Sequence, residues 1–515
     1  MKPDVFIIII HWNTPELLRK QLSLLKKDNN LQIIVIDNSS RKSVDWILSE
    51  FEDIQLIKNT VNRGFAFACN QGTVKAAGEW LLFLNPDVEI SSQQIERMLN
   101  FAKEQNLDAC SPKPMSDNYD SPVATPLALL AEFTPLSRIL PKKTLFNPKT
   151  LTGGCLLIKE NVLKNLGGWD ERFFLWYEDS DLTLRLMKTG HKIGWAPIKI
   201  QHVGGASFEK LDKQLRRDIF FHSMDVFAKK HFSPLGQLII SLIKKRYTRR
   251  KVLPQLHEGV DITVPNMKID LLKLFFYNNG GFLDEFNELI VVSSSLSANN
   301  IWDWRRKYPQ VRFIPINKNY GVASTINMGF RASTSKWMGT INDDVTLSKG
   351  SLTNLLQCAK ENSGSLNPSI YHDRNTIESM GVQVLKYGKA APIKKIVNKK
   401  CFEADSVNGA AVLFANAALN KVGLFDERFG SYLEDIDLSM RISRGGYKNI
   451  IAPSIKVLHA GQSSSKNLGI KKQWYDFRNW IYVIVKNWSL KDLIFNLPSI
   501  FIERLRNLSG VLKAF

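Results

Sequence analysis

Residues 81–90 read LLFLNPDVEI: an apolar run breaks at Asn85-Pro86-Asp87 and then resumes. A continuous apolar run of this kind is typical of a strand that is buried on both faces of a parallel sheet. Asn and Pro favour a sharp turn, so we expect Asp87 at the carboxyl end of the sheet, where α/β proteins bind ligands. Taken alone, an aspartate that only forms the turn is an equally good interpretation.

The same shape returns later in the chain, at residues 338–347 (MGTINDDVTL). Residues 62–72 (NRGFAFACNQG) return as residues 319–329 (NYGVASTINMG), and residues 167–186 (GGWDERFFLWYEDSDLTLRL) return as residues 423–442 (GLFDERFGSYLEDIDLSMRI). The second member of each pair lies 256 or 257 positions after the first. Several motifs in one order at one offset indicate a tandem duplication.

Each copy alternates strand and helix patterns. In the first copy, residues 5–13 and 31–40 have the pattern of buried strands, and the segment between them has helical spacing, with Thr14 as candidate N-cap and Pro15 at the first helical position. This alternation predicts two tandem α/β domains. In the second copy Pro265 interrupts the first strand, which predicts an edge strand or a bulge there.

The length of 515 residues also favours more than one domain, because single cores rarely grow beyond about 250–300 residues. We expect a first domain over residues 1–245, a linker over 246–258, a second domain over 259–487 and a helical tail over 488–515. The tail combines helical apolar spacing with basic residues. It could lie on anionic lipid or simply pack on the second domain.

The composition is that of a globular protein, with 44% hydrophobic and 23% charged residues. A net charge of +20 favours anionic partners, namely nucleic acid, phosphorylated small molecules or an anionic membrane surface. A basic surface without a partner is the alternative. No helix-turn-helix, RNP-like or zinc pattern accompanies the charge, so nucleic acid is not the expected partner.

The five cysteines are scattered and show no CxxC spacing, which predicts reduced thiols with neither a disulfide nor a zinc site. The sequence has no signal-peptide layout and no apolar run near the ~20 residues that span a bilayer. We therefore expect a cytosolic protein that can associate with a membrane.

Acidic residues occur where chemistry would need them. Asp37 follows the strand IIVI and could accept hydrogen bonds from a base or ribose, or merely form a turn. Glu178, Asp179 and Asp181 begin a predicted helix directly after the aromatic run FFLWY. Such residues can cap a helix, but an aromatic wall also raises a carboxylate pKa, which suits a general base. His202 is a candidate metal ligand, although a lone histidine is usually structural.

These residue types together indicate one reaction. Carboxylate and imidazole suit Mg²⁺ or Mn²⁺, with phosphate oxygens as the remaining ligands. The metal would neutralise charge on a diphosphate leaving group, and a separate carboxylate would deprotonate an attacking hydroxyl. The sequence therefore predicts group transfer from a nucleotide diphosphate to an alcohol.

The ordered motifs IIIIHWN, IVIDNSS, NRGFAFACNQG, FLNPDVEI, GGWDERFFLWYEDSDL and HVGGAS resemble those of family 2 inverting glycosyltransferases of the GT-A fold. The first copy is most similar to rhamnosyltransferase-like members. In the second copy, residues 473–488 resemble the Arg-Asn helix that follows the catalytic core of galactofuranosyl- and related polysaccharide transferases. The resemblance covers nearly the whole chain and implies two tandem GT-A domains.

The resemblance also implies roles for residues of the first copy. The implied donor-binding residues are Trp12, Asp37, Asn38, Arg63, Gly64, Asn85, Asp87 and Glu178. Asp37 would contact the base. Asp87 matches the last residue of the family's DxD metal motif, and His202 matches its later metal or diphosphate ligand. Asp179 matches the catalytic base of a single inverting displacement.

The second copy keeps the chemistry and changes the nucleotide side. The implied residues are Asn342, Asp343 and Glu434 for the donor, Asp344 and His459 for the metal, and Asp435 as the base. Asp37 is replaced by Ser293 and Arg63 by Tyr320. We therefore favour a second active transferase with a different donor or linkage. An inactive domain that binds acceptor is the alternative.

The resulting hypothesis is a two-domain transferase that uses dTDP- or UDP-linked donors of rhamnose, another hexose or galactofuranose. The acceptor would be a polysaccharide or an undecaprenyl-diphosphate-linked glycan, at the inner face of the bacterial cytoplasmic membrane. An anionic membrane surface is the expected partner, with the protein bound peripherally. A nucleic-acid-binding protein is a remote alternative.

Overall fold

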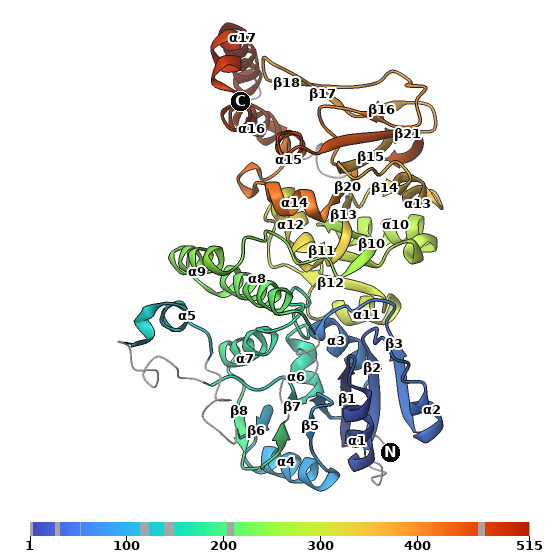
Figure 1. The fold of residues 1–515 in the computed structure, drawn as a ribbon, viewed down its shortest axis with the longest axis vertical. Helices are drawn as coiled ribbons and strands as arrows, with labels where there is room; N and C mark the ends of the chain where they lie inside the picture. Colours follow the sequence, from blue (N-terminus) through green and yellow to red (C-terminus); the bar gives the residue numbers. More distant parts are fainter. Residues whose placement is uncertain are drawn as a thin grey trace. The chain divides into compact units, whose positions relative to one another are not determined.

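The computed structural model describes residues 4–25, 31–51, 53–113, 123–138, 149–202, 211–461 and 469–513. Its contacts define two compact units (Figure 1). Unit 1 comprises Met1–Arg249 and Ser297–Pro309, and unit 2 comprises Arg250–Leu296 and Gln310–Phe515. Both units are α/β, as the sequence predicted. Among the described residues, no helix has the length and apolar character needed to cross a membrane.

The sheet of unit 1 has the strand order β3-β2-β1-β4-β7-β6-β8. Its strands are β1 (Val5–His11), β2 (Leu31–Asp37), β3 (Ile54–Lys58), β4 (Trp80–Leu84), β6 (Ala109–Pro112), β7 (Cys155–Lys159) and β8 (Ile193–Ala196). β1 runs parallel to both β2 and β4, so the carboxyl ends of these three strands meet at one edge. The turns that follow these strand ends carry predicted site residues of the first copy.

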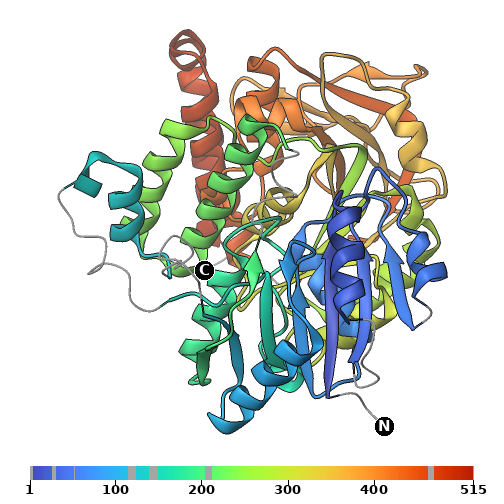
Figure 2. The same cartoon turned by 60° about the horizontal axis from the view of Figure 1, so that its bottom comes forward.

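Helices cover both faces of this sheet, which explains why its strands are almost wholly apolar (Figures 1 and 2). Val5, Ile7 and Ile9 pack against α1 (Pro15–Leu25) and α4 (Ser92–Glu104). Phe6 and Ile8 face α3 (Phe65–Lys75), α6 (Glu160–Asn165) and α7 (Glu178–Lys188). Helix α1 begins at Pro15 as predicted, although the Thr14 hydroxyl has no hydrogen-bond partner within the described chain.

The sheet of unit 2 repeats this topology, with the order β12-β11-β10-β13-β20-β15-β21-β14. Its strands are β10 (His257–Asn266), β11 (Glu288–Ser293), β12 (Val311–Pro315), β13 (Ser335–Ile341), β14 (Val345–Thr346), β15 (Ser363–Tyr371), β20 (Ala411–Ala415) and β21 (Lys448–His459). On one face lie α12 (Val322–Ala332), α14 (Asn416–Val422) and α15 (Glu434–Arg444). The duplication seen in the sequence is therefore a duplication of strand order.

The expectation that Pro265 turns its strand into an edge or a bulge is wrong. β10 is central and pairs with β11 on one side and β13 on the other. The pairs with β13 end at Thr263, so the missing N–H of Pro265 removes no bond from that ladder. The register shift of β10 lies between His257 and Val260, away from the proline.

Each unit also contains a pair of packed helices that follows its sheet. These are α8 (Lys213–His231) with α9 (Pro234–Tyr247), and α16 (Gly469–Asn487) with α17 (Leu490–Lys513). The predicted tail over 488–515 is thus mostly one helix, α17. Unit 2 adds the hairpin of β17 (Val382–Leu385) and β18 (Lys389–Pro392).

One helix departs from the predicted domain boundaries. α11 (Ile301–Lys307) falls inside the predicted second domain, but its contacts place it in unit 1. Arg305 forms a buried ion pair with Glu171 at 2.7 Å, and Trp302 Nε1 donates to the carbonyl oxygen of Lys164 at 3.0 Å. Tertiary packing decides this placement, and no sequence pattern reports it.

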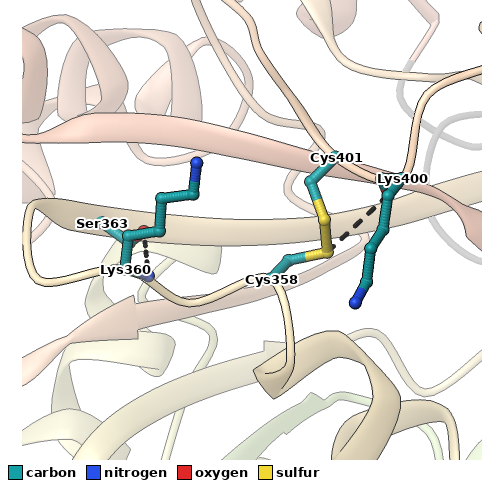
Figure 3. Close-up of a disulfide and its surroundings, with 5 residues drawn as sticks. All are labelled: Cys358, Lys360, Ser363, Lys400 and Cys401. Carbon is teal, nitrogen blue, oxygen red and sulfur yellow. Dashed lines mark hydrogen bonds between the residues drawn. A yellow bond between two sulfur atoms is a disulfide. The ribbon is translucent and has the colours of Figure 1, made fainter.

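The expectation of five reduced thiols is wrong for two of them. Cys358 and Cys401 form a disulfide in unit 2, with their Cα atoms 6.0 Å apart (Figure 3). Cys358 follows α13 (Ser351–Leu356), Cys401 precedes β19 (Phe402–Glu403), and both elements contact β21. No local pattern predicts this pairing, because the partners are 43 residues apart and are brought together by a third element.

Candidate active sites

The turn after β4 in unit 1 and the turn after β13 in unit 2 contain the same hydrogen bond. The amide of Val88 donates to the carbonyl oxygen of Asn85 at 3.1 Å, and that of Val345 donates to Asn342 at 3.1 Å. Within these turns lie Asp87 and Asp344, both almost buried. The short strand β5 (Val88–Glu89) then pairs with β9 (Gln201–His202), opposing Val88 to His202. In unit 2 Val345 opposes His459 in the same way.

In unit 2 this register brings the predicted metal ligands together. Asp344 Oδ1 lies 3.3 Å from His459 Nε2, and the other ring nitrogen, Nδ1, lies 2.8 Å from Glu378 Oε2. Burial alone would lower the His459 pKa, but hydrogen bonds to Asp344 and Glu378 outweigh burial and raise it to about 9. Glu378 lies on β16 (Ile377–Ser379) and no sequence motif marks it. The side chain of His202 lies outside the described part of the structure.

The described side chains could hold a divalent cation only if a substrate supplied further ligands. A carboxylate and an imidazole are suitable ligands for Mg²⁺ or Mn²⁺. In the part of the chain that the structure describes, no cluster of three or more His, Cys, Asp or Glu side chains could hold a metal ion. The site in unit 2 therefore fits an ion whose other ligands come from a substrate such as a diphosphate.

The nucleotide side differs between the units. In unit 1 the strand ends carry His11 and Asp37, whose Nδ1 and Oδ1 atoms are 3.1 Å apart. At the equivalent positions in unit 2, Ser293 Oγ donates to Asn266 Oδ1 at 2.7 Å. Asn266 Nδ2 in turn donates to Asp343 Oδ2 at 2.8 Å. Burial, aided by the charge of Asp344, raises the Asp343 pKa to about 6.

The loop after β3 in unit 1 is organised around Asn38. Its Oδ1 accepts from the amide of Arg63 at 3.0 Å, and its Nδ2 donates to the carbonyl oxygen of Gly64 at 3.1 Å. The half-buried Trp12 follows β1 at the same edge of the sheet. These contacts bring the predicted donor residues of the first copy to one edge.

A glycine is required where this loop meets the segment before α7. Gly64 has φ +81°, and a Cβ there would lie 2.4 Å from the carbonyl oxygen of Phe174. Gly321 of unit 2 has φ +85°, and its Cβ would lie 2.7 Å from the carbonyl oxygen of Gly430. Any side chain at either position would displace the loop that leads to the catalytic candidates.

That loop is strained in both units. Trp176 and Tyr177 have φ values of 67° and 68°, and Tyr432 and Leu433 have values of 70° and 66°. Each non-glycine residue in the left-handed region costs on the order of 1–3 kcal/mol and persists only where its surroundings enforce it. The repetition of the strain directly before Glu-Asp in both units indicates that this conformation serves the site.

A buried side chain on the following helix holds each strained loop. Asn479, on α16, donates to the carbonyl oxygens of Phe429, Ser431 and Tyr432 at 3.1, 2.9 and 2.8 Å. The neighbouring Arg478 donates to the carbonyl oxygen of Phe429 at 2.8 Å. These two residues are the Arg-Asn pair of the helix singled out in the sequence, and the structure shows what they bind.

In unit 1 a smaller residue holds the strained loop. Ser223, on α8, occupies the position equivalent to Asn479 and donates to the carbonyl oxygen of Leu175 at 2.6 Å. No sequence pattern marks Ser223, because a serine within a helix usually has no special role.

The predicted bases are held by backbone amides at the start of α7 and α15. Asp179 Oδ1 accepts from the amide of Ser180 at 2.7 Å. Asp435 accepts from the amides of Ile436 and Gly409, both at 2.9 Å. Burial raises the pKa of both carboxyl groups above the ordinary range. The amides fix each carboxylate in orientation, while burial makes it more basic than in water.

Each glutamate beside a base has one buried carboxylate oxygen. Among the described residues, Glu178 Oε2 and Glu434 Oε2 have no hydrogen-bond partner. Burial, followed by the charge of the adjacent aspartate, raises both pKa values, that of Glu434 to about 8. A polar oxygen kept buried and unbonded is costly, which is expected where a ligand supplies the missing partner.

The third acidic residue of each motif has a structural role. Asp181 is fully buried and pairs with Arg185, Lys230 and His231 at 2.8, 2.5 and 2.7 Å. In unit 2, Asp437 pairs with Arg441 and Lys486, both at 2.9 Å. These contacts fix the catalytic helix to the following helix, so only the first two acidic residues remain for chemistry.

Comparison with known proteins identifies the family. Residues 6–167 and 282–402 match the family model "Glycosyl transferase family 2", which covers more than half of the chain. The chain therefore belongs to glycosyl transferase family 2.

Three curated relatives illustrate the similarity. A low-salt glycan biosynthesis hexosyltransferase, Agl10, of Haloferax volcanii is 28% identical over 38% of this chain and 66% of its own length. The N-acetylglucosaminyl-diphospho-decaprenol L-rhamnosyltransferase of Mycobacterium tuberculosis is 27% identical over 30% of this chain and 60% of its own length. The dTDP-rhamnosyl transferase RfbF of Shigella flexneri is 23% identical over 53% and 93%, respectively. The chain thus spans about two thirds or less of the first two relatives.

Proposed function

We propose that the chain is a dual-site inverting glycosyltransferase of glycan biosynthesis, with one catalytic centre in each unit. One observation carries the proposal. Both units present a Glu-Asp pair behind the same strained loop, Trp176-Tyr177 in one and Tyr432-Leu433 in the other. Strain of this kind is expensive, and a domain that had lost catalysis would have no reason to retain it.

In this mechanism Asp179 and Asp435 act as general bases. Each would take the proton of an acceptor hydroxyl as the oxygen attacks the anomeric carbon from the side opposite the diphosphate, so the configuration inverts. The raised pKa of each aspartate suits this role because it makes the carboxylate a better proton acceptor. The amides that hold Asp435 would keep it oriented during the displacement.

A bound Mg²⁺ or Mn²⁺ would neutralise the charge that develops on the leaving diphosphate. Asp87 and His202 would hold it in unit 1, and Asp344 and His459 in unit 2. Asn85, Asn342 and Asp343 lie on the same turns and would face the donor. Glu178 and Glu434 would meet polar groups of the donor or acceptor, which would supply the partner that their buried oxygens lack.

The two donors would differ. Asp37 offers a carboxylate to a base in unit 1, whereas Ser293 in unit 2 is fully buried and bonded to Asn266. Relatives named as rhamnosyltransferases support dTDP-rhamnose as the first donor. The second donor would be a UDP-linked or other nucleotide-linked hexose or galactofuranose.

We place the reaction at the inner face of the bacterial cytoplasmic membrane, with the protein bound peripherally to anionic lipid. The acceptor would be an undecaprenyl-diphosphate-linked or polysaccharide glycan. The support is the net charge of +20 and a relative whose name specifies a diphospho-decaprenol acceptor.

The test is transfer by wild type, Asp179→Asn, Asp435→Asn and the double variant across a panel of nucleotide sugars, with products identified by mass spectrometry. Loss of a positioned base typically costs about 10²–10⁴-fold in rate. We expect each single variant to lose one product and retain the other, with inverted configuration at each new bond. Unchanged products in both single variants would refute the proposal.

The alternative is that unit 2 binds acceptor without catalysis. The hydrogen-bonded network of Ser293, Asn266 and Asp343 favours this alternative. Ser293 stands at the strand end where unit 1 has Asp37, so the end of β11 offers no carboxylate to a nucleobase. In that case Asp435→Asn would change no product, while Asp179→Asn would abolish all transfer.

A further inference from the structure

The outward face of helix α17 is apolar, which is unusual for a surface helix. Its outward side carries a row of large, exposed apolar side chains: Ile494, Phe495, Leu497, Phe501, Ile502 and Leu505. Phe495 is 83% exposed and Phe501 is 62% exposed. Exposed apolar residues are usually scattered, whereas a contiguous row of this kind marks an interaction surface.

The inward side of α17 combines apolar and polar contacts, and Ile500 packs there in a cluster with Trp480 and Val483. Arg504 donates to the carbonyl oxygen of Gly388 and lies over the ring of Trp480, 5.5 Å from its centroid. Asn507 Nδ2 donates to Asp476 Oδ2 at 2.9 Å. These buried contacts fix the rotation of α17, so its apolar row cannot turn inward without breaking them.

A basic segment borders the apolar row. The β17–β18 hairpin packs on α17, with Lys386 bonded to Asp492 at 3.1 Å and Lys389 paired with Glu503 at 3.9 Å (Figure 1). This hairpin and the loop that follows it expose six lysines, namely Lys386, Lys389, Lys394, Lys395, Lys399 and Lys400. The exposed Ile396 lies among them. Apolar and basic groups are therefore juxtaposed on one element pair.

The same kind of row recurs independently in unit 1. Helix α9, which follows α8 as α17 follows α16, exposes Leu235, Leu238 and Leu242 with the exposed Lys245 and Arg246 after them. Leu238 and Ile494 occupy equivalent positions of the two copies, 256 residues apart. An accidental apolar patch would not be expected twice at one place in a duplicated fold.

We propose that the outward face of α17 and the lysines of residues 386–400 form the surface by which this chain binds an anionic lipid bilayer. The helix would lie in the interface with its apolar row among the acyl chains, while the lysines meet phosphate headgroups. The inference rests on the membrane location in the proposed function, and not on its chemistry.

A second copy of the chain fits this surface less well. A symmetric dimer brings the same surface of two copies together, so the two lysine clusters would share one interface. Like charges brought together in this way oppose association. An anionic surface instead satisfies the apolar row and the lysines at once.

The experiment is co-sedimentation of the full chain with phosphatidylcholine vesicles, with and without phosphatidylglycerol. We expect binding that requires the anionic lipid and weakens with salt. Phe495→Ser/Phe501→Ser should weaken partitioning by roughly tenfold or more, because both side chains would leave the acyl region. Lys394→Glu/Lys395→Glu should weaken it by a similar factor. All four side chains are exposed, so folding should be unaffected, and circular dichroism checks this.

Matched substitutions of exposed residues elsewhere in unit 2, Tyr277→Ser and Lys349→Glu, should leave partitioning unchanged. Wild-type binding to anionic vesicles that α17 variants retain in full would overturn the inference alone. Absence of wild-type binding would overturn both the inference and the membrane location. Concentration-dependent dimers that the Phe variant disrupts, without vesicle binding, would assign the surface to a second copy. Transfer to a water-soluble acceptor tests the chemistry separately.

Discussion

Glu434 has a strongly altered environment at the second candidate site. The side chain is half-buried beside Asp435, and one of its oxygens is buried and has no hydrogen bond within the described chain. Burial and the charge of Asp435 raise its pKa to about 8. At neutral pH the side chain is therefore mostly a neutral acid beside the base. A neutral acid can donate a hydrogen bond, which a second carboxylate could not do.

This pKa predicts a pH-dependent stability. The unfolded chain holds the glutamate proton only below about pH 4.3, whereas the folded chain holds it up to about pH 8. Unfolding in this window releases a proton, so this group's contribution to stability is lost as pH rises from about 4.3 to 8. Glu434→Gln removes the effect, and its melting temperature relative to wild type should increase from pH 5 to pH 8. The exposed Glu361→Gln should show a constant difference, and a constant difference for Glu434→Gln would contradict the prediction.

Some site residues could be predicted from the sequence because both copies repeat them. Asp87, Asp344, Asp179 and Asp435 stand at strand or helix ends in repeated motifs, although their catalytic roles stay a prediction. Glu378 could not be found, because β16 reaches His459 only through tertiary packing. The backbone strain at Tyr432-Leu433 was equally invisible, since neither residue type favours a left-handed conformation.

Helix α16 acts on the second site through Asn479. This side chain bonds three successive parts of the loop that precedes Glu434 and makes no contact with the reacting groups itself. It is a positioning residue: it stabilises a backbone conformation that would otherwise relax. The equivalent Ser223 in unit 1 makes one such bond.

We predict that Asn479→Ala lowers kcat of the second-site transfer by on the order of a hundredfold, because the loop that places Asp435 loses its tether. Donor affinity, measured by calorimetry with the nucleotide diphosphate, should change little. Asn479→Ser, which restores the residue type of the first copy, should recover part of the loss. Equal losses in both transfer steps, or no recovery with serine, would argue for a general folding defect instead.

At the level of elements, the sequence predicted several strands and helices of the first copy through their apolar periodicity. The continuous run of β1 and the helical spacing of α1 needed no tertiary information. The prediction of an edge strand or bulge at Pro265 failed because the rule for prolines assumes hydrogen bonds to a neighbouring strand on both sides. β10 no longer pairs with β13 beyond Thr263. The Cys358–Cys401 disulfide and the β17–β18 hairpin have no counterpart motif, so nothing local announced them.

At the scale of the whole molecule, the duplication did not predict which segments make up unit 1. Unit 1 includes Ser297–Pro309, a segment that belongs to the second copy in sequence. Arg305 of that segment is buried against Glu171 and donates to the carbonyl oxygen of Gly167 at 2.8 Å. Glu171 itself accepts from Asn70 in the motif that recurs in both copies. A helix of the second copy thus completes the ion pairing of the first.

Arg305→Met should therefore destabilise unit 1 rather than unit 2. Removing one partner of a buried ion pair typically costs about 3–5 kcal/mol, since the other charge stays buried. Hydrogen exchange resolved by peptide would show faster exchange in β1, β2 and β4, with β10, β11 and β13 protected as in wild type. The neighbouring exposed Arg306→Met should cost no more than about 0.5 kcal/mol. An equal effect of the two substitutions would contradict the assignment of α11 to unit 1.

The placement of α11 also bears on how such a gene can change. A duplicated gene can normally lose or exchange one copy by recombination at the junction, which here would fall near residue 249. Such an event would separate the first copy from a helix that its buried Glu171 depends on. We therefore expect the two copies to persist together, and a chimera that exchanges the second copy to need residues 297–309 kept with the first.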